Sequence, residues 1–305
     1  MNFNSKNFCD EYNISFNITI ENVCQSNKLK SNSLCFNLNI DDDFVKSTAE
    51  YTNIVVFVPL KCEYQSLRDD ILFLKVVNPR FSYIKASHDY ATLRPTPDRH
   101  NVYISEESFV SDSATICPNV YIGPNCYISE NSYIYPGANL IENVYIGKNS
   151  IIGSNTVIGS WGFGVERDNG KERSLYPHNG KAYKMPHFGG VHIDDDCDIG
   201  ALNTIDSGAI EPTYISKNVQ TDDHVHIAHN CYIGKGSCIT ACAEISGSVR
   251  IGDEVWVGPN SSIMQKIKIG DRSVIGLGSV VLRSVNEYEI VAGSPARVIK
   301  KSNDE

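Results

Sequence analysis

An aliphatic residue returns at every sixth position over most of this chain of 305 residues. The phase holds over residues 104–158, resumes over 193–205 and, after one slip, continues over 215–281. An amphipathic helix repeats every 3.6 residues and a strand every two, so neither explains a period of six. Hexapeptide repeats of this kind are the signature of a parallel β-helix.

The residues between the aliphatic positions fit the same structure. Asn or Gly stands three places after seven successive aliphatic residues, and both types tolerate the left-handed backbone that a sharp corner needs. These corner residues are Asn119, Asn125, Asn131, Gly137, Asn143, Asn149 and Asn155. We therefore expect each hexad to form one short strand and one corner, with three hexads closing a triangular coil.

The repeats define the domain organisation that we expect. Residues 1–98 lack the period and contain short apolar runs, which are typical of a small α/β domain. Residues 99–285 form the β-helix, and residues 286–305 form a C-terminal cap or tail. A long loop rich in glycine, aromatic and charged residues interrupts the repeats at 160–190. Long loops of this kind are often functional.

Composition excludes some classes of partner. The formal net charge of −9 argues against general binding of nucleic acid or anionic membranes. Ten cysteines are scattered without CxxC pairs, as expected for reduced thiols in a cytoplasmic protein. No signal peptide is evident, and no apolar run approaches the ~20 residues of a membrane span.

The densest polar cluster is Thr221-Asp222-Asp223-His224-Val225-His226-Ile227-Ala228-His229-Asn230. Histidine and aspartate this close together can supply a general base with an acidic partner, or a metal site. Histidines on a repeat surface are also often simply solvated. His178 and His187, in the loop, are able to line a pocket but are more simply read as solvated residues.

The region 159–234 resembles bacterial UDP-3-O-acylglucosamine N-acyltransferases, which are left-handed parallel β-helix enzymes of lipid A synthesis. The stretches that carry the resemblance are Gly162-Phe163-Gly164, Lys184-Met185-Pro186, Ile199-Gly200-Ala201, Thr204-Ile205-Asp206, Gly208-Ala209 and Ile227-Ala228-His229-Asn230. The resemblance extends weakly over the N-terminal domain, where Phe36 and Asn39 fall at an aromatic and an Asn of the family's nucleotide pocket. The expected fold is therefore mainly β: a left-handed parallel β-helix with a small N-terminal α/β domain.

The resemblance also implies catalytic roles. His229 matches the family's general base, and Asp222 matches the carboxylate that orients it. Gly247, one coil of 18 residues beyond His229, matches the backbone N–H that stabilises the oxyanion. His224, Phe163 and Gly164 are expected to contact the substrate, together with Asn39 and Phe36.

The chain also departs from this family. A second family histidine falls at Lys266, an arginine is replaced by Ser207, and a tyrosine of the nucleotide pocket has no match near Asp42. The tail resembles that of hexapeptide acetyltransferases that use acetyl-CoA, instead of ending in a long helix. That likeness implies cofactor contacts at Gly276, Gly278, Ala292, Gly293 and Arg297, with Lys266 as a further basic residue.

The favoured function is transfer of an acyl group, most simply acetyl from acetyl-CoA, to the amine of a UDP- or dTDP-linked amino sugar. The first alternative is the lipid A reaction with acyl carrier protein as donor. The others are a γ-carbonic-anhydrase-like metalloenzyme and a β-helix scaffold without chemistry. No bound metal is expected in the favoured reading. The family builds its sites between subunits, so we also expect a homotrimer.

Overall fold

The computed structural model describes residues 2–3, 5–14, 18–65, 68–92, 100–168 and 181–301. The chain divides into two compact units, Met1–Pro95 and Thr96–Glu305. The sequence boundary placed between residues 98 and 99 lies outside the described residues, as do residues 169–180 of the predicted loop, which include His178.

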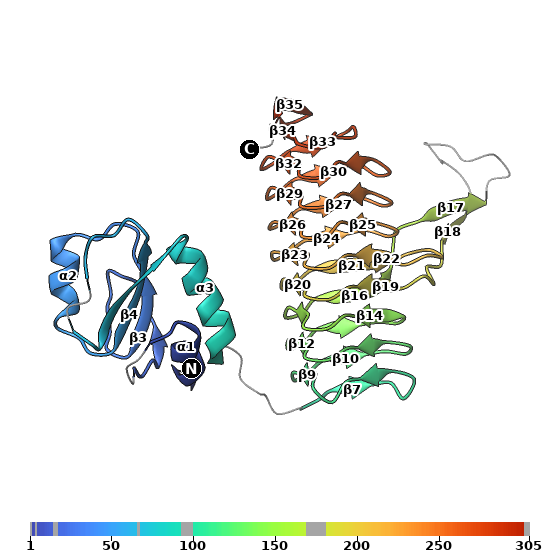
Figure 1. The fold of residues 1–305 in the computed structure, drawn as a ribbon. Helices are drawn as coiled ribbons and strands as arrows, with labels where there is room; N and C mark the ends of the chain where they lie inside the picture. The colour runs from blue at the N-terminus through green and yellow to red at the C-terminus, as the bar shows by residue number, and fades with distance from the viewer. Residues whose placement is uncertain are drawn as a thin grey trace. The chain divides into compact units, whose positions relative to one another are not determined.

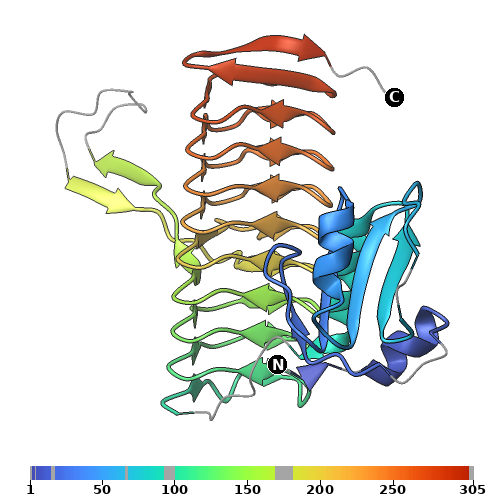
Figure 2. The ribbon, with the colours of Figure 1, turned by 90° about the vertical axis from the view of Figure 1, so that its left-hand side faces the viewer.

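The larger unit is a β-helix whose short parallel strands stack in three sheets (Figures 1 and 2). The first sheet holds β7 (Tyr103–Ile104), β10 (Tyr121–Ile122), β13 (Asn139–Leu140), β16 (Val157–Trp161), β21 (Thr204–Ser207), β24 (His226–Ile227), β27 (Glu244–Ile245), β30 (Ser262–Ile263) and β33 (Val280–Val281). The second holds β8 (Phe109–Val110), β11 (Tyr127–Ile128), β14 (Val144–Ile146), β19 (Val191–Ile193), β22 (Thr213–Ile215), β25 (Tyr232–Ile233), β28 (Arg250–Ile251) and β31 (Lys268–Ile269). The third holds β9 (Thr115–Ile116), β12 (Tyr133–Ile134), β15 (Ile151–Ile152), β20 (Asp198–Ile199), β23 (Gln220–Thr221), β26 (Cys238–Ile239), β29 (Trp256–Val257), β32 (Val274–Ile275), β34 (Glu289–Gly293) and β35 (Ala296–Lys301).

The hexad pattern explains both the core and the corners of this coil. The in-phase aliphatic residues stack in register, as Ile227 does on Ile245, and form one continuous buried cluster. The predicted left-handed corners are confirmed: Asn119 has φ 60°, Asn131 has φ 59° and Gly137 has φ 76°. Burial of the apolar stripe drives coil upon coil together, so each coil is stabilised mainly by its neighbours.

Aromatic rings form a ladder along the outside of the second sheet. The ladder consists of Phe109, Tyr127, Tyr145, His192, Tyr214 and Tyr232, whose neighbouring ring centroids lie 4.4–5.7 Å apart. The guanidinium of Arg250 extends it, 5.0 Å from the ring centroid of Tyr232. Such cross-strand pairs stabilise neighbouring coils.

Two hairpins depart from the regular coil. After β16 the chain leaves the solenoid and forms β17 (Val165–Asp168) and β18 (Lys181–Lys184), an antiparallel pair inside the predicted loop (Figure 1). At the C-terminus, β34 continues the third sheet parallel to β32, and β35 then folds back antiparallel on β34 (Figure 2). The segment expected to leave the repeat at residue 286 therefore adds one more strand before it turns back.

The smaller unit is an α/β domain with a four-stranded parallel sheet in the order β2 (Asn22–Val23), β3 (Ser33–Phe36), β4 (Ile54–Pro59) and β5 (Ile71–Val76). Its helices are α1 (Ser5–Glu11), α2 (Asp42–Thr48) and α3 (Pro79–Tyr90), and β1 (Asn2–Phe3) pairs with β6 (Ala91–Thr92). Alternate residues of β4 enter two separate apolar clusters: Val55 and Phe57 lie in one, and Ile54 and Val56 in the other. Among the residues that the structure describes, no helix is long and apolar enough to cross a membrane.

Leu202 offers a test of the corner rule. It has φ 57° at a corner where most coils place Asn, and its side chain is exposed. A left-handed conformation costs a residue with a Cβ roughly 1 kcal/mol. Leu202→Asn is therefore expected to raise the free energy of unfolding by about 0.5–1 kcal/mol, measured by urea denaturation. The control is Leu277→Asn, an exposed residue just before the left-handed Gly278, which is expected to change stability little. Equal effects of the two substitutions would contradict the rule.

Candidate active site

His229 lies at the corner where the chain passes from β24 in the first sheet to β25 in the second. A pocket of about 480 Å³ opens at this corner. Its lining residues are Phe163, Gly164, Val165, Met185, His187, Ala209, His229, Asn230, Gly247, Ser248, Gln265 and Lys266. The structure thus brings together five residues that the sequence assigned to the site: Phe163, Gly164, His229, Gly247 and Lys266.

Two glycines flank the imidazole of His229. A Cβ atom built on Gly247 would lie 2.7 Å from Nε2 of His229, and one built on Gly162 would lie 2.8 Å from Cδ2. Neither position has room for a side chain while the ring stays in place. The predicted stacking of Gly247 on His229, one coil of 18 residues apart, is therefore confirmed. Ile227 and Ile245, which are also 18 residues apart, pair across the same two coils.

Hydrogen bonds of Asn230 fix which nitrogen of His229 is free. Oδ1 of Asn230 accepts from the backbone N–H of Ala209 at 3.2 Å, and Nδ2 donates to the carbonyl oxygen of Glu211 at 3.3 Å. Nδ1 of His229 lies 3.0 Å from the same Oδ1. Because an amide oxygen only accepts, Nδ1 must donate. The neutral ring then carries its lone pair on Nε2, beside Gly247.

The partly buried carboxylate that interacts electrostatically with His229 belongs to Asp206. Its side chain is 14% exposed, and its Oδ2 lies 3.9 Å from Nε2 of His226. Burial raises the pKa of Asp206 above the usual aspartate range. The electrostatic attraction of a positively charged His226 or His229 lowers it in part. Nδ1 of His226 in turn hydrogen-bonds Oγ1 of Thr204 at 2.7 Å.

Sequence reasoning did not assign a role to Asp206. Thr204 pairs with His226, so the register offset there is 22 residues and not 18. The extra residues belong to the slip in the repeat between Ile205 and Ile215, so a count of one regular coil from His226 or His229 does not lead to β21. The family match at Thr204-Ile205-Asp206 was the available signal.

Asp222 and His224 lie at a different corner, between β23 and β24. Oδ1 of Asp222 accepts from the backbone N–H of Asp223, and its side chain is exposed. His224 is exposed with φ 61°, and its backbone N–H donates to Ala201. Neither residue lines the pocket at His229. The structure therefore does not bring the predicted Asp222–His229 pair together within one chain.

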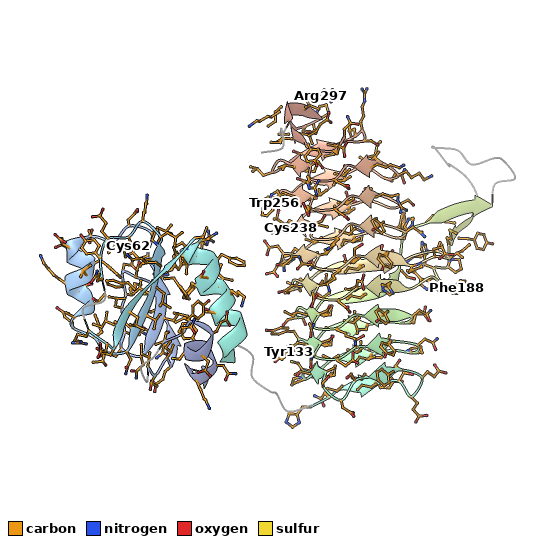
Figure 3. All side chains as sticks on the ribbon, in the orientation of Figure 1. Cys62, Tyr133, Phe188, Cys238, Trp256 and Arg297 are labelled. Carbon is orange, nitrogen blue, oxygen red and sulfur yellow. The ribbon has the colours of Figure 1, made fainter. Side chains whose placement is uncertain are left out.

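The residues expected to bind the cofactor divide between two places. Lys266 lies at the His229 pocket, where its backbone N–H donates to Gly247. Ala292, Gly293 and Arg297 lie in the C-terminal hairpin, and Figure 3 shows Arg297 at that end of the solenoid. A Cβ on Gly276 would meet Cβ of Ala292 at 2.9 Å, and Gly278 is a left-handed corner with open space around it.

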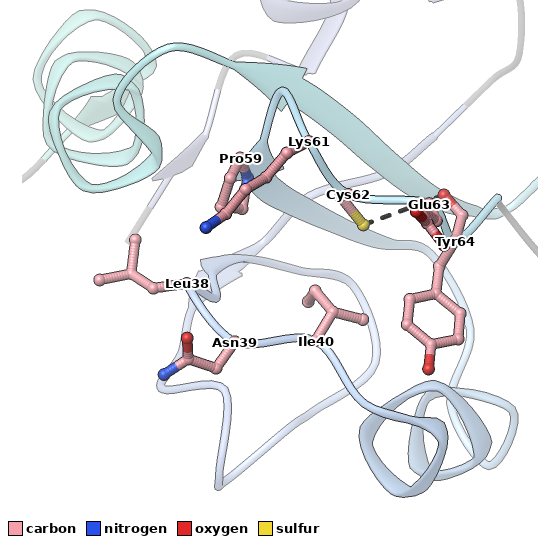
Figure 4. A pocket seen from close by; sticks show the side chains of 8 residues that line it. All are labelled: Leu38, Asn39, Ile40, Pro59, Lys61, Cys62, Glu63 and Tyr64. Carbon is pink, nitrogen blue, oxygen red and sulfur yellow. Dashed lines mark hydrogen bonds between the residues drawn. The ribbon is translucent and has the colours of Figure 1, made fainter.

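The N-terminal unit has a pocket of its own, of about 360 Å³ (Figure 4). Its lining residues are Leu38, Asn39, Ile40, Pro59, Lys61, Cys62, Glu63 and Tyr64. Asn39 thus lines a pocket as expected, whereas Phe36 packs on Tyr83, with ring centroids 5.3 Å apart. Oη of Tyr64 donates to Asp42 at 2.8 Å, which raises the pKa of Tyr64. The sequence offers no match for the family's tyrosine near Asp42, but Tyr64, 22 residues later in the chain, contacts it in the folded unit.

His187 differs from its sequence interpretation as a solvated loop residue. It is only 1% exposed, and its ring lies against that of His229 with centroids 5.0 Å apart. The described parts of the chain contain no group of three or more His, Cys, Asp or Glu side chains arranged to hold a metal ion.

Comparison with known proteins agrees with this architecture. The bacterial transferase hexapeptide model (six repeats) matches residues 212–247 and 248–283, and the GMPPB C-terminal domain model matches residues 99–166. LpxA from Acinetobacter baumannii superposes with a TM-score of 0.57 at 23% identity, covering 67% of this chain and 74% of that one. The LpxA of Bacteroides fragilis gives 0.56 at 23% identity, covering 68% and 73%.

Curated relatives are similar over a shorter stretch. UDP-3-O-acylglucosamine N-acyltransferase of Delftia acidovorans is 36% identical over 117 residues, which are 38% of this chain and 35% of that protein. The protein of the same name from Campylobacter lari is 35% identical over 143 residues, 47% of this chain and 42% of its own length. The matches thus span less than half of these relatives. The chain thus carries hexapeptide repeats, shares the fold of these LpxA structures, and is similar over part of its length to UDP-3-O-acylglucosamine N-acyltransferases.

Proposed function

We propose that this protein is an N-acyltransferase that moves an acyl group from a thioester to the amine of a nucleotide-linked amino sugar. One observation carries the proposal: the free Nε2 of His229 lies beside the backbone of Gly247 in a single pocket. The names of the curated relatives, which specify N-acyl transfer, support an amine as the acceptor.

The geometry supplies the two groups that acyl transfer needs. The amine attacks the thioester carbon, and Nε2 of His229 takes the proton that the nitrogen loses as the C–N bond forms. The Gly247 N–H, which has no acceptor among the described residues, donates to the carbonyl oxygen as that oxygen becomes negative. The C–S bond then breaks, and His229 returns the proton to the departing thiolate. General-base assistance of this kind is worth ~10²–10⁴ in rate.

Asp206 has a supporting role in this mechanism. His229 becomes positively charged when it takes the proton, and a buried carboxylate nearby stabilises that charge. Asn230 holds the ring with Nε2 toward the pocket in both protonation states, since Oδ1 accepts from Nδ1 in either.

The acceptor and donor assignments rest on different parts of the chain. The N-terminal pocket, which Asn39 and Tyr64 help to line, supports the binding of a UDP or dTDP group. The C-terminal hairpin with Ala292, Gly293 and Arg297 supports acyl-CoA, most simply acetyl-CoA, as the donor. The names of the curated relatives favour the alternative, a UDP-3-O-acylglucosamine acceptor, for which acyl carrier protein is the family's donor. A homotrimer with sites between subunits belongs to the same proposal.

Thiol release separates the two donors. The protein is incubated with UDP-linked amino sugars and either acetyl-CoA or 3-hydroxyacyl carrier protein, and free thiol is followed over time. We expect turnover with one donor, and a loss of at least ~100-fold in His229→Ala, because the general base is removed. Retention of thermal stability shows that the variant is folded. Near-normal turnover by folded His229→Ala would refute the assignment of the base.

Asp206→Asn and Asp222→Asn distinguish the two candidate carboxylates. Loss of the Asp206 charge is expected to lower kcat about tenfold, because the positive charge that His229 acquires in the reaction is then less stabilised. Asp222→Asn should change kcat less than about twofold, since it lies at another corner. The opposite ranking would restore Asp222 as the partner of His229.

The Asp206 variant also has an expected effect on stability. Burial raises the pKa of Asp206, so the folded chain binds this proton more tightly than the unfolded chain. The free energy of unfolding therefore falls as pH rises through the two pKa values. Asp206→Asn removes this loss and should unfold at a higher temperature than the parent at about pH 8.

A further inference from the structure

His187 is a buried histidine with one nitrogen unused. Its Nδ1 lies 2.8 Å from the carbonyl oxygen of Met185, and because a carbonyl only accepts, Nδ1 donates. Its Nε2 is buried and has no hydrogen-bond partner among the described residues. An unsatisfied buried polar atom costs roughly 1–3 kcal/mol, so such atoms in native proteins require a reason.

The surrounding backbone holds His187 in this position. Oγ of Ser207 donates to the carbonyl oxygen of His187 at 3.2 Å, and the N–H of Phe188 donates to Ala209 at 3.0 Å. The N–H of Met185 donates to Gly164 at 2.7 Å, which ties this segment to the base of the β17–β18 hairpin. The ring therefore has little freedom to find another partner for Nε2.

The location of His187 indicates what its free nitrogen is for. His187 lines the pocket with His229, and the two rings meet edge to face with an interplanar angle of 62°. Each neutral ring presents an unprotonated Nε2. The two rings are in contact, so a small nucleophile binds beside them, against the pocket wall that both rings help to line. The unpaired ring nitrogens at that wall are hydrogen-bond acceptors and not donors.

We propose that His187 is a specificity-determining residue that accepts a second N–H of the attacking amine and so selects amines over hydroxyls. This inference rests on the proposed acyl transfer. A primary amine carries two hydrogens: one is the proton that His229 removes, and the other stays on nitrogen in the amide product. An alcohol has only one hydrogen, which His229 takes, so Nε2 of His187 would remain unpaired. His187 accepts a hydrogen bond and transfers no proton, so the proton transfer through His229 and the exchange of the C–S bond for a C–N bond are unchanged.

The test compares two acceptors in three proteins. kcat/KM is measured by thiol release with a UDP-linked amino sugar and with its counterpart that carries a hydroxyl in place of the amine. In His187→Phe, which keeps an aromatic ring but no acceptor, kcat/KM for the amine is expected to fall about 10–100-fold. The value for the hydroxyl should change less than about twofold, so the preference for the amine collapses. His187→Gln restores an acceptor and should keep more of the preference.

The control is His192→Phe. His192 belongs to the aromatic ladder of the second sheet and does not line the pocket, so both values should stay as in the parent. If His187→Phe does not fold, the comparison rests on His187→Gln. In that variant the ratio of kcat/KM for the amine to kcat/KM for the hydroxyl is expected to fall measurably, but by less than about tenfold.

The outcomes separate this inference from the proposed function. If the parent acylates the amine and the amine-to-hydroxyl ratio is the same in every folded His187 variant, the role of His187 is wrong and the N-acyltransferase assignment stands. If the parent acylates only the hydroxyl, or releases thiol with neither acceptor, both are overturned.

Discussion

The stacking register of the coils is the constraint on which the rest of this structure depends. Each inward aliphatic side chain packs on its equivalent in the next coil, as Ile227 does on Ile245, and the backbone hydrogen bonds between coils follow from that packing. Because one face is buried, a slip of one residue would turn the core outward. The same register sets His229 against Gly247, so this pair is a product of the fold's repeat, whereas the inserted hairpin segment supplies other residues of the pocket.

Regular parts of the chain could be predicted from sequence, and irregular parts could not. The period of six gives the coil, the corners at Asn119 and Asn131, and the His229–Gly247 neighbours, since all of them depend on counting within unbroken hexads. Asp206 escapes the count because an insertion lengthens its coil. His187 escapes it as well, since the β17–β18 hairpin brings it to the pocket and no periodicity describes that hairpin.

The site carries costs that the solenoid offsets. Asp206 is a carboxylate whose pKa is raised by burial, and His187 holds a buried nitrogen without a partner. Both reduce stability. His187 lines the pocket of the proposed general base His229, and Asp206 interacts electrostatically with both histidines. Local violations of good packing rules are expected where a protein binds and reacts. The long apolar column beneath the site supplies the stability that tolerates them.

Gly247→Ala tests most directly whether the stacking of His229 on the Gly247 backbone forms the reactive centre. The added Cβ would lie 2.7 Å from Nε2 of His229, so it would displace the ring or block the approach of the thioester to the Gly247 N–H. We expect thiol release to fall by at least ~100-fold while thermal unfolding and circular dichroism stay close to those of the parent. Turnover within about twofold of the parent, in a variant equally well folded, would contradict the account.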